Sequence, residues 1–575
     1  GVLLCRPDPR SLAPRVVCFK SKLDFERFAG FPLISAATPT KYITMELAEL
    51  IIALKKRRQQ IQADSKPANP TPGTSIASVA KRTRPSREQD DYSQGTKIMR
   101  YSGPELPEDI WCHIHALLPL PDAARAGCVS REFLRSWRCH PNLTFSQETL
   151  GVKRTFSEKI CGSDTLAWKF TKIVDQIMEK RAGIGVKIFK LEYCGSRIYT
   201  RHLKSWLQVA VNPGLEELVL SLPVVYDAKY YNFPCSLLFN GNGKSISYLN
   251  LKGCAFHPVA GLGCLRKLHL SRVHITGDEL GCLLSNSLVL KELNLSQCNK
   301  ITCLKIPCLL NQFNHLTVFG CKTLELIENK APNLCTVRID TTPVRLPFGD
   351  SLRVKNLEML WPFEYNLVYY ARADLPRIMP NLETLGISSA GEVLNTPIVT
   401  AKFLHLKLLE ICLSVAEGAF SPAYDYLSLV FFLDACPVLE TFKLSVWQTR
   451  MKHDPVSGDS SLLRKIPGHH HASIKNVKID GFCSAKSMIE LTCHILDNAT
   501  SLENLKLDPI YVGGYEHVDR LTVHEIGDCS PHTGQRMIRE AHKSVLAIEK
   551  YIVGKVPSNV KLNIQKPCSQ CHSVK

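Results

Sequence analysis

Residues 290–301 read LKELNLSQCNKI, and this stretch decides how most of the chain folds. Apolar residues stand at its first, fourth and sixth positions, which are Leu290, Leu293 and Leu295. The last two leucines alternate with polar residues, and such alternation is typical of a short strand with one buried face. The stretch therefore predicts a short strand whose leucines point into a core and whose polar residues face the other way.

The same pattern recurs over most of the chain. Clear copies begin at Leu215, Ile246, Leu265, Leu290, Leu334, Leu382, Leu439, Ile474 and Leu502, and weaker copies begin near Val186, Phe313, Leu357 and Leu408. Their starts are roughly 19 to 35 residues apart. The pattern resembles the leucine-rich repeat, whose period is about 20 to 29 residues. A single copy cannot bury its own apolar face, so we expect the copies to stack into a curved parallel sheet with helices or loops on its convex side.

A segment with a helical rather than a strand pattern precedes the repeats. Residues 106–137, LPEDIWCHIHALLPLPDAARAGCVSREFLRSW, predict three short helices. Pro107 suits the first turn of a helix with apolar residues at three- and four-residue spacing. Pro119 and Pro121 end that helix, and Asp122 is expected to cap the second one.

This segment resembles an F-box, although Pro121 departs from the commoner Leu-Pro-x-x-Asp run. By that resemblance it docks a Skp-family adaptor, which links to a cullin and a RING subunit. The docking residues implied are Leu106, Pro107, Ile110, Ile114, Leu117, Leu118, Leu120, Val129 and Ser130. The alternative is that the helices only cap the solenoid. A unit this small cannot bury all its apolar residues, so an apolar surface left for a partner is expected.

A second resemblance lies toward the other end of the chain. Residues 474–507 look like the FBD domain of plant F-box proteins, with a Val-x-Ile strand, a turn at Gly481 and a helix over 488–496. A later helix around 541–551 and the strand VKLNI would complete it. The chain is thus identified as similar to plant F-box proteins with leucine-rich repeats and a C-terminal FBD-like domain. The resemblance implies an α/β fold, with a small three-helix F-box module followed by a curved leucine-rich-repeat solenoid and an FBD-like C-terminal cap.

The expected divisions follow from these segments. They are a basic, largely disordered N-terminal region at 1–104 with a helix at 45–62, the F-box at 105–150, the solenoid at 185–470, the FBD-like cap at 471–565 and a tail at 566–575. Residues 1–104 hold 18 Lys and Arg against 9 Asp and Glu, which is half of the net charge of +18. Two basic runs there resemble nuclear-import patches, but a solvated tail is the simpler interpretation.

Composition excludes several classes of protein. With 45% hydrophobic and 22% charged residues the chain is globular. It has no apolar run of the roughly 18 residues that cross a membrane. Its 23 cysteines are scattered through apolar segments, as buried thiols are in a reducing compartment. We therefore expect a location in the nucleus and/or cytoplasm, with neither a membrane nor nucleic acid as partner.

Two short motifs could suggest metal or haem chemistry. Residues 568–572 spell the haem-attachment motif C-x-x-C-H, but a terminal tail offers no pocket for haem. The run His469–His471 follows Pro467 and a glycine and is interpreted as a solvated turn. No phosphate loop, nucleophile elbow or zinc-protease spacing is present. We expect no cofactor, no metal site, no catalytic residue and no enzymatic activity.

The resemblance implies the substrate-recognition adaptor of an SCF-type (Skp-cullin-F-box) ubiquitin ligase, with an unidentified protein substrate on the concave sheet. Candidate substrate-binding residues are Tyr248, Asn250, Lys267, His269, Glu292, Asn294, Arg338, Lys443 and Lys478. Their basic and polar mixture favours an acidic target. Two alternatives remain open. One is a ligand-gated receptor with a pocket near 424–432, and the other is a free-standing solenoid that binds protein or nucleic acid.

Overall fold

The computed structural model divides the chain into two compact units, residues 1–101 and 102–575. The structure describes residues 2–8, 11–19, 107–128, 131–152, 164–181, 185–193, 198–224, 230–340, 353–361, 366–414, 424–447, 453–467, 470–510 and 535–567. The helix expected at 45–62 and the motif at 568–572 lie outside these ranges. None of the described helices combines the length and the apolar character needed to cross a membrane.

The first unit contains a pair of antiparallel strands, β1 (Val2–Asp8) and β2 (Ser11–Phe19). The register shifts between Arg6 and Asp8. The prediction of a largely disordered N-terminal region stays a prediction for residues 20–104. Both strands contain Val, and β2 ends in Phe19, and these residue types favour extended backbone even without a regular alternation.

The second unit opens with three short helices, α3 (Glu108–Ala116), α4 (Leu120–Gly127) and α5 (Arg131–Arg138). They confirm the three helices predicted over this segment. The start of α4 differs from the expectation, because Pro119 stands at the N-cap and Pro121 within the first turn. Asp122 is therefore not the cap; it bonds Arg125 one turn later. A proline fits the first turn because its missing N–H would have no helical partner there.

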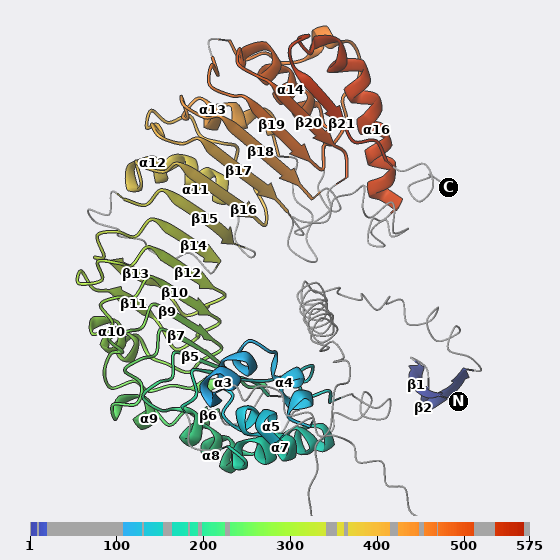
Figure 1. Ribbon diagram of the computed structural model, residues 1–575. Coiled ribbons are helices and arrows are strands. Elements are labelled where there is room, and N and C mark those ends of the chain that lie inside the picture. The colour runs from blue at the N-terminus through green and yellow to red at the C-terminus, as the bar shows by residue number, and fades with distance from the viewer. Residues whose placement is uncertain are drawn as a thin grey trace, which may run out of the picture. The chain divides into compact units, whose positions relative to one another are not determined.

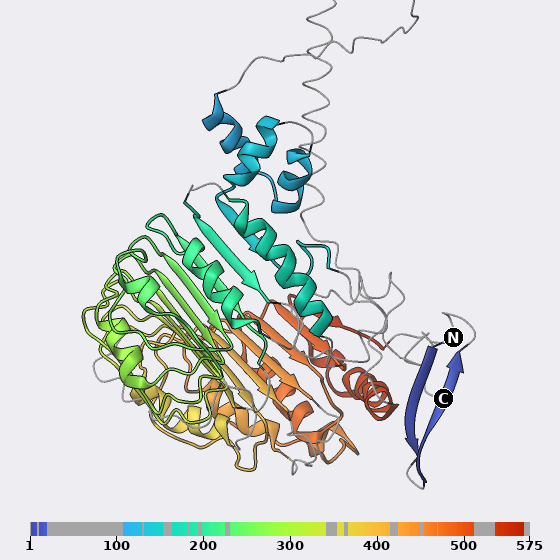
Figure 2. The same ribbon diagram turned by 90° about the horizontal axis from the view of Figure 1, so that it is seen from below.

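After α5, fifteen of the described strands form one parallel sheet. Figure 1 shows its strands on the inner side of an arc, with α10, α12 and α13 on the outer side, and Figure 2 shows the arc end-on. The strands are β3 (Asn142–Phe145), β4 (Ile188–Glu192), β5 (Glu217–Ser221), β7 (Tyr248–Lys252), β9 (Lys267–Ser271), β10 (Glu292–Ser296), β12 (His315–Phe319), β14 (Thr336–Asp340), β15 (Asn356–Trp361), β16 (Thr384–Ser389), β17 (Leu408–Leu413), β18 (Thr441–Val446), β19 (Asn476–Asp480), β20 (Asn504–Asp508) and β21 (Lys561–Ile564).

The connections between strands carry the outer elements. These are the helices α7 (Asp164–Glu179), α8 (Thr200–Ala210), α9 (Ser236–Phe239), α10 (Gly277–Ser285), α11 (Leu367–Ala373), α12 (Leu375–Ile378), α13 (Val430–Leu433), α14 (Lys486–Asn498) and α16 (Gln535–Tyr551), the 3₁₀ turns η1 (Tyr426–Leu429), η3 (Ser460–Leu462) and η4 (Val553–Lys555), and two small sheets, β6 (Tyr231–Asn232) with β8 (Cys254–Ala255) and β11 (Cys303–Ile306) with β13 (Leu326–Asn329).

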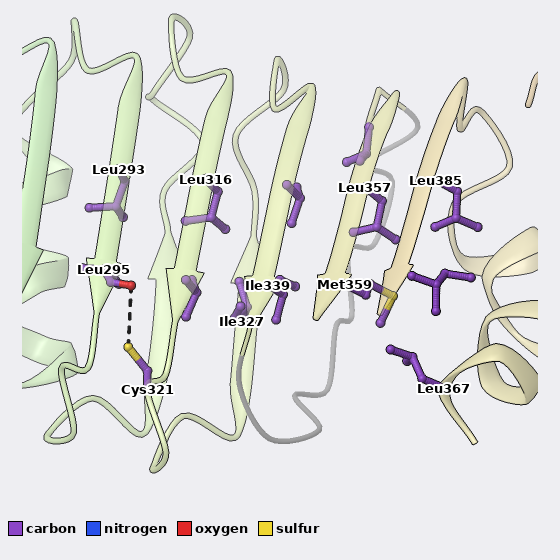
Figure 3. Close-up of a cluster of buried hydrophobic side chains, with 14 of the residues drawn as sticks. Leu293, Leu295, Leu316, Cys321, Ile327, Ile339, Leu357, Met359, Leu367 and Leu385 are labelled. Atoms are coloured by element: carbon purple, nitrogen blue, oxygen red, sulfur yellow. Dashed lines mark hydrogen bonds between the residues drawn. The ribbon is translucent and has the colours of Figure 1, made fainter. Parts of the chain in front are cut away.

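The repeated leucines explain the stacking. Leu293 pairs in register with Leu316, and Leu357 with Leu385, so equivalent side chains lie side by side along the sheet (Figure 3). All four are at most 1% exposed. Each copy thus buries its apolar face against its neighbours, as expected for a repeat that cannot do so alone.

The sheet runs past both limits predicted for the solenoid. It begins at β3, before residue 185, because the alternating residues of NLTF bury Leu143 and Phe145 as later strands do. It continues through β19, β20 and β21 without interruption. The elements of the FBD-like resemblance are all present there, including the turn at Gly481, whose positive φ of 71° suits glycine. The cap is therefore a continuation of the same sheet.

Candidate interaction surfaces

Helix α3 presents an apolar stripe. Ile110, Ile114 and Leu117 are 42%, 37% and 68% exposed. They are spaced by four and three residues, and this spacing places them on one side of a helix and its last turn. Exposed large apolar side chains in such a row are typical of a surface that a partner covers.

The other residues implied for docking are placed differently. Pro107 is exposed and Leu118 is half-buried, whereas Leu120 is only 6% exposed and belongs to the core. Leu120 therefore offers little side-chain surface to a partner, since α4 packs it inward. Leu106, Val129 and Ser130 lie outside the described residues.

Leu134 on α5 was not among the predicted docking residues. Its side chain is 38% exposed, close to the value for Ile114. Leu134 could have been found from the sequence, because it lies in a short amphipathic helix one turn before the half-buried Trp137. We add Leu134 to the apolar surface formed by the three-helix module.

His140 joins the three helices to the sheet. Its Nδ1 accepts a hydrogen bond from the Asn142 backbone N–H at 3.1 Å. The ring proton therefore lies on Nε2, which donates to the Leu118 carbonyl at 3.2 Å. The Asn142 side chain reaches the Ala116 carbonyl, and Arg181 donates to the His140 carbonyl at 2.8 Å. The end of α3 is thus fastened to the first strand by several hydrogen bonds.

The side chains that face away from the leucines form the surface that we call the inner face. All nine predicted substrate-binding residues lie on it, on strands β7, β9, β10, β14, β18 and β19. Tyr248, Lys267 and Glu292 are in register across three neighbouring strands. Lys443 and Lys478 are register partners farther along the sheet. The structure therefore gathers the predicted residues into two separate groups.

Four predicted cations have carboxylate neighbours, in four separate pairs. The N–O distances are 3.1 Å for Lys267 with Glu292, 2.5 Å for Arg338 with Glu358, 3.3 Å for Lys443 with Glu410 and 2.6 Å for Lys478 with Asp480. Sequence reasoning missed the acidic partners on β15 and β17, because pairing across strands depends on register. The pairs remove the basis for expecting an acidic target from an excess of basic residues.

A chain of hydrogen bonds crosses strands β7, β9 and β10. The Asn250 amide donates to the Tyr248 hydroxyl at 3.0 Å, and that hydroxyl lies 3.2 Å from His269 Nδ1. His269 Nε2 donates to Glu292 at 2.8 Å. Burial acts to raise the pKa of Glu292, but the hydrogen bonds from Lys267 and His269 outweigh it and lower the pKa. Glu292 is therefore ionised at neutral pH and orients the chain.

The inner face is hollowed in two places that share Arg338 and Leu360. The first hollow, of about 420 Å³, spans β7 to β15, and its lining includes Asn250, His269 and Asn294. The second hollow, also of about 420 Å³, spans β12 to β17 and includes Glu358 and Glu410. Four of the nine predicted residues line one or both hollows, namely Asn250, His269, Asn294 and Arg338. Three more bond a lining residue, namely Tyr248, Glu292 and Lys443.

The segment at 424–432, where a ligand pocket was an alternative, is part of the core. Tyr424 and Tyr426 are 4% and 2% exposed, and Phe432 is fully buried and stacks on Phe403 at 5.7 Å. Burial raises the pKa of the Tyr424 phenol. These large side chains fill the space between the sheet and the outer elements.

His471 corrects the interpretation of the histidine run as a solvated turn. Its side chain is buried, and its Nε2 lies 3.2 Å from His494 Nε2 on α14. His470 is exposed, and His469 lies outside the described residues. Within the described part of the chain, no three His, Cys, Asp or Glu side chains form a group suited to a metal ion.

A family model described as the At1g61320/AtMIF1 LRR domain matches residues 177–569. The chain belongs to this family. A model of the F-box domain matches residues 104–144, which include the apolar stripe of α3. The chain is accordingly a plant F-box/LRR protein of the FBD-associated kind.

Three curated relatives from Arabidopsis thaliana are similar to this F-box/LRR protein. The putative F-box/LRR-repeat protein At5g38386 is 27% identical over 22% of this chain and 30% of its own length. The F-box/FBD/LRR-repeat protein At4g00160 is 25% identical over 33% of this chain and 39% of its own length. The FBD-associated F-box protein At1g66310 is 21% identical over 70% of this chain and 89% of its own length. The chain thus spans well under half the length of the first two relatives.

A crystal structure of an internalin from Listeria monocytogenes also matches this F-box/LRR protein. The match has a TM-score of 0.26 and 12% identity, and it covers 59% of this chain and 87% of the internalin.

Proposed function

We propose that this protein is the substrate-recognition adaptor of an SCF-type ubiquitin ligase. In this role the three-helix module docks a Skp-family adaptor, which brings a cullin and a RING subunit, and the inner face holds a target protein. The observation that carries the proposal is the exposed stripe of Ile110, Ile114 and Leu117 inside the segment that matches the F-box.

The mechanism is proximity. The protein supplies no reacting group; it holds a target near a conjugating enzyme that other subunits recruit, which raises the effective concentration of the target's lysines. The hydrogen bonds that fasten α3 to β3 through His140 and Asn142 support this mechanism, because they limit hinge motion between the docking module and the first strand. Such an adaptor acts in the nucleus and/or cytoplasm.

The test is capture of a purified Skp-family adaptor by the full chain. The change Ile110→Asp with Leu117→Asp places two charges in the stripe, and burial of an unpaired carboxylate on docking is costly. We expect capture to fall at least tenfold. The matched control is Leu288→Asp with Leu309→Asp, because these leucines are similarly exposed, at 51% and 58%, but lie on the solenoid. Equal capture by both double variants, with circular dichroism unchanged, would reject the docking role.

A further inference from the structure

Five of the ten residues that line the first hollow on the inner face have uncharged polar side chains. Asn250, Asn294 and Thr317 occupy the same register position on strands β7, β10 and β12. Ser271 on β9 and Ser296 on β10 lie two residues beyond that position on their own strands. These side chains offer amide and hydroxyl groups that donate and accept hydrogen bonds without carrying charge.

Much of this hydrogen-bonding capacity is unused. Among the described residues, Asn294, Ser271 and Ser296 have side chains for which no hydrogen-bond partner is found. Asn250 uses one amide hydrogen on Tyr248, and its carbonyl oxygen remains for another donor. A partner that supplies amides or hydroxyls would replace the water that hydrogen-bonds these groups, whereas an apolar partner would leave them without hydrogen bonds.

The charges around the hollow oppose an anionic partner. Arg338 is bonded through two of its nitrogens to both carboxylate oxygens of Glu358, and Glu292 holds Lys267 and His269. Asp340 is the register partner of Phe319 at the end of β14. A phosphate or a run of carboxylates placed here would meet three carboxylates, and the cations beside two of them, Glu358 and Glu292, already bond those carboxylates. Phosphate recognition ordinarily uses a cluster of arginines.

One apolar contact point stands among the polar groups. Phe319, at the end of β12, is 45% exposed and lines the hollow together with Leu360 on β15. Strands β12 and β15 are separated only by β14, so the two side chains lie about 10 Å apart at roughly 4.8 Å per strand. Asp340, the register partner of Phe319, lies on the strand between them, so an apolar side chain of a partner would pack on Phe319 itself.

We propose that this hollow binds an unphosphorylated, uncharged segment of the target protein, rich in Asn, Gln, Ser or Thr, with one apolar side chain packed on Phe319. The inference deepens the proposed function by naming the chemistry of the target segment. It also rests on that function for calling the bound protein a substrate.

The probe is an array of synthetic nine-residue peptides with one position fixed at a time, including fixed phosphoserine and fixed Asp or Glu. The full chain is applied as wild type, as Asn294→Ala with Ser296→Ala, and as Phe319→Ala. The matched control is Asn563→Ala with Ser445→Ala, which removes the same two groups from strands β21 and β18 of the same face, outside the hollow.

We expect the wild type to select neutral polar peptides with one apolar residue. Each hollow variant should bind them about tenfold more weakly, since two hydrogen bonds or one aromatic contact are lost, and the control should bind as the wild type does. Selection of phosphorylated or acidic peptides, or equal weakening in the control, would overturn the inference. Preference for uncharged oligosaccharides on a parallel glycan array, or no peptide binding at all, would overturn it too.

Capture of the Skp-family adaptor is measured on the same preparations. If every variant captures the adaptor but the wild type binds no peptide, this inference fails and the ligase role stands. If the peptides bind as described but the adaptor is not captured, the hollow is a peptide site of a free-standing solenoid and the ligase role fails.

Discussion

Arg338 on β14 and Glu358 on β15 bond each other along one edge of the guanidinium, with Nε 2.5 Å from Oε2 and Nη2 2.7 Å from Oε1. The two residues are direct register partners in the parallel sheet. Two parallel N–H···O bonds fix the plane of the arginine as well as its position. The inner face therefore presents Arg338 as part of a neutral pair rather than as an isolated cation.

The coupling between these two residues should be small. Their side chains are 53% and 37% exposed, so solvent screening limits the interaction to about 0.2–1 kcal/mol of unfolding free energy. A double-mutant cycle with Arg338→Gln and Glu358→Gln, followed by urea unfolding, measures it. The coupling should shrink further in 1 M salt. A coupling well above 2 kcal/mol would contradict the description of the inner face as a solvated surface.

Arg464 should matter much more to stability. It donates to Asp425 at 2.8 Å and to Glu490 at 2.6 Å, and the Glu490 side chain is fully buried. The change Arg464→Ala leaves the Glu490 carboxylate buried without its cation, which costs about 3–5 kcal/mol for a buried pair. Because Arg464 is half-exposed, we expect the unfolding free energy to fall by about 3 kcal/mol, the lower end of this range.

Urea unfolding of Arg464→Ala measures this loss, and its neighbour Lys465→Ala is the control. Lys465 is exposed, so its change should stay within about 0.5 kcal/mol. Similar small effects for both variants would show that water reaches Glu490 and replaces the arginine.

Local patterns in the sequence predicted the strands and the apolar face of the first helix. The leucine spacing predicted strands such as β10, and the spacing of Ile110, Ile114 and Leu117 predicted a one-sided helix, since both depend only on near neighbours in the chain. The acidic partners of Arg338 and Lys443 could not be predicted. Glu358 comes from the repeat after that of Arg338, and Glu410 comes from the repeat before that of Lys443. The irregular repeat lengths conceal the register that brings each pair together.

Burial of individual residues was also beyond local pattern. Leu120 matches the docking motif, yet it is the first residue of α4 and only 6% exposed. His471 stands in a polar run, yet it is buried against His494 from a helix 23 residues later. Both outcomes depend on contacts between separate elements, and one sequence does not encode these as spacing.

Glu540 on α16 should make stability depend on pH. Its carboxylate accepts hydrogen bonds from the Ser484 backbone N–H and hydroxyl at 2.8 and 2.6 Å, and it lies 3.2 Å from His453. Burial acts to raise the pKa of Glu540, but the bonds from His453 and Ser484 outweigh it and lower the pKa. A pKa that is lower in the folded state adds stability above the unfolded pKa of about 4.3, and this stability is lost as pH falls through the folded pKa.

The comparison is urea unfolding of the wild type and Glu540→Gln between pH 7 and pH 3.5. We expect the wild type to be the more stable protein at pH 7 and the difference to narrow below about pH 4.3. Other carboxylates titrate in the same pH range in both proteins, so their contributions to the unfolding free energy cancel in the difference. A difference that stays constant with pH would mean that Glu540 contributes only through its shape.

The stacked leucines should carry the largest single contributions to stability. Leu293 is fully buried between Leu268 of β9 and Leu316 of β12, its register partners. The change Leu293→Ala leaves a cavity in one repeat and should cost about 2–5 kcal/mol. Leu309→Ala is the control, since 58% of that side chain is exposed and its loss should cost under about 0.5 kcal/mol.

Thermal and urea unfolding of both leucine variants measure these costs. Because each repeat contacts only its neighbours, the loss at Leu293 should also lower the protection of β9 and β12 against amide hydrogen exchange more than that of β19 and β20. Uniform loss of protection along the whole sheet would show that the fifteen strands unfold as one unit, and the description of the protein as a stack of separable repeats would then fail.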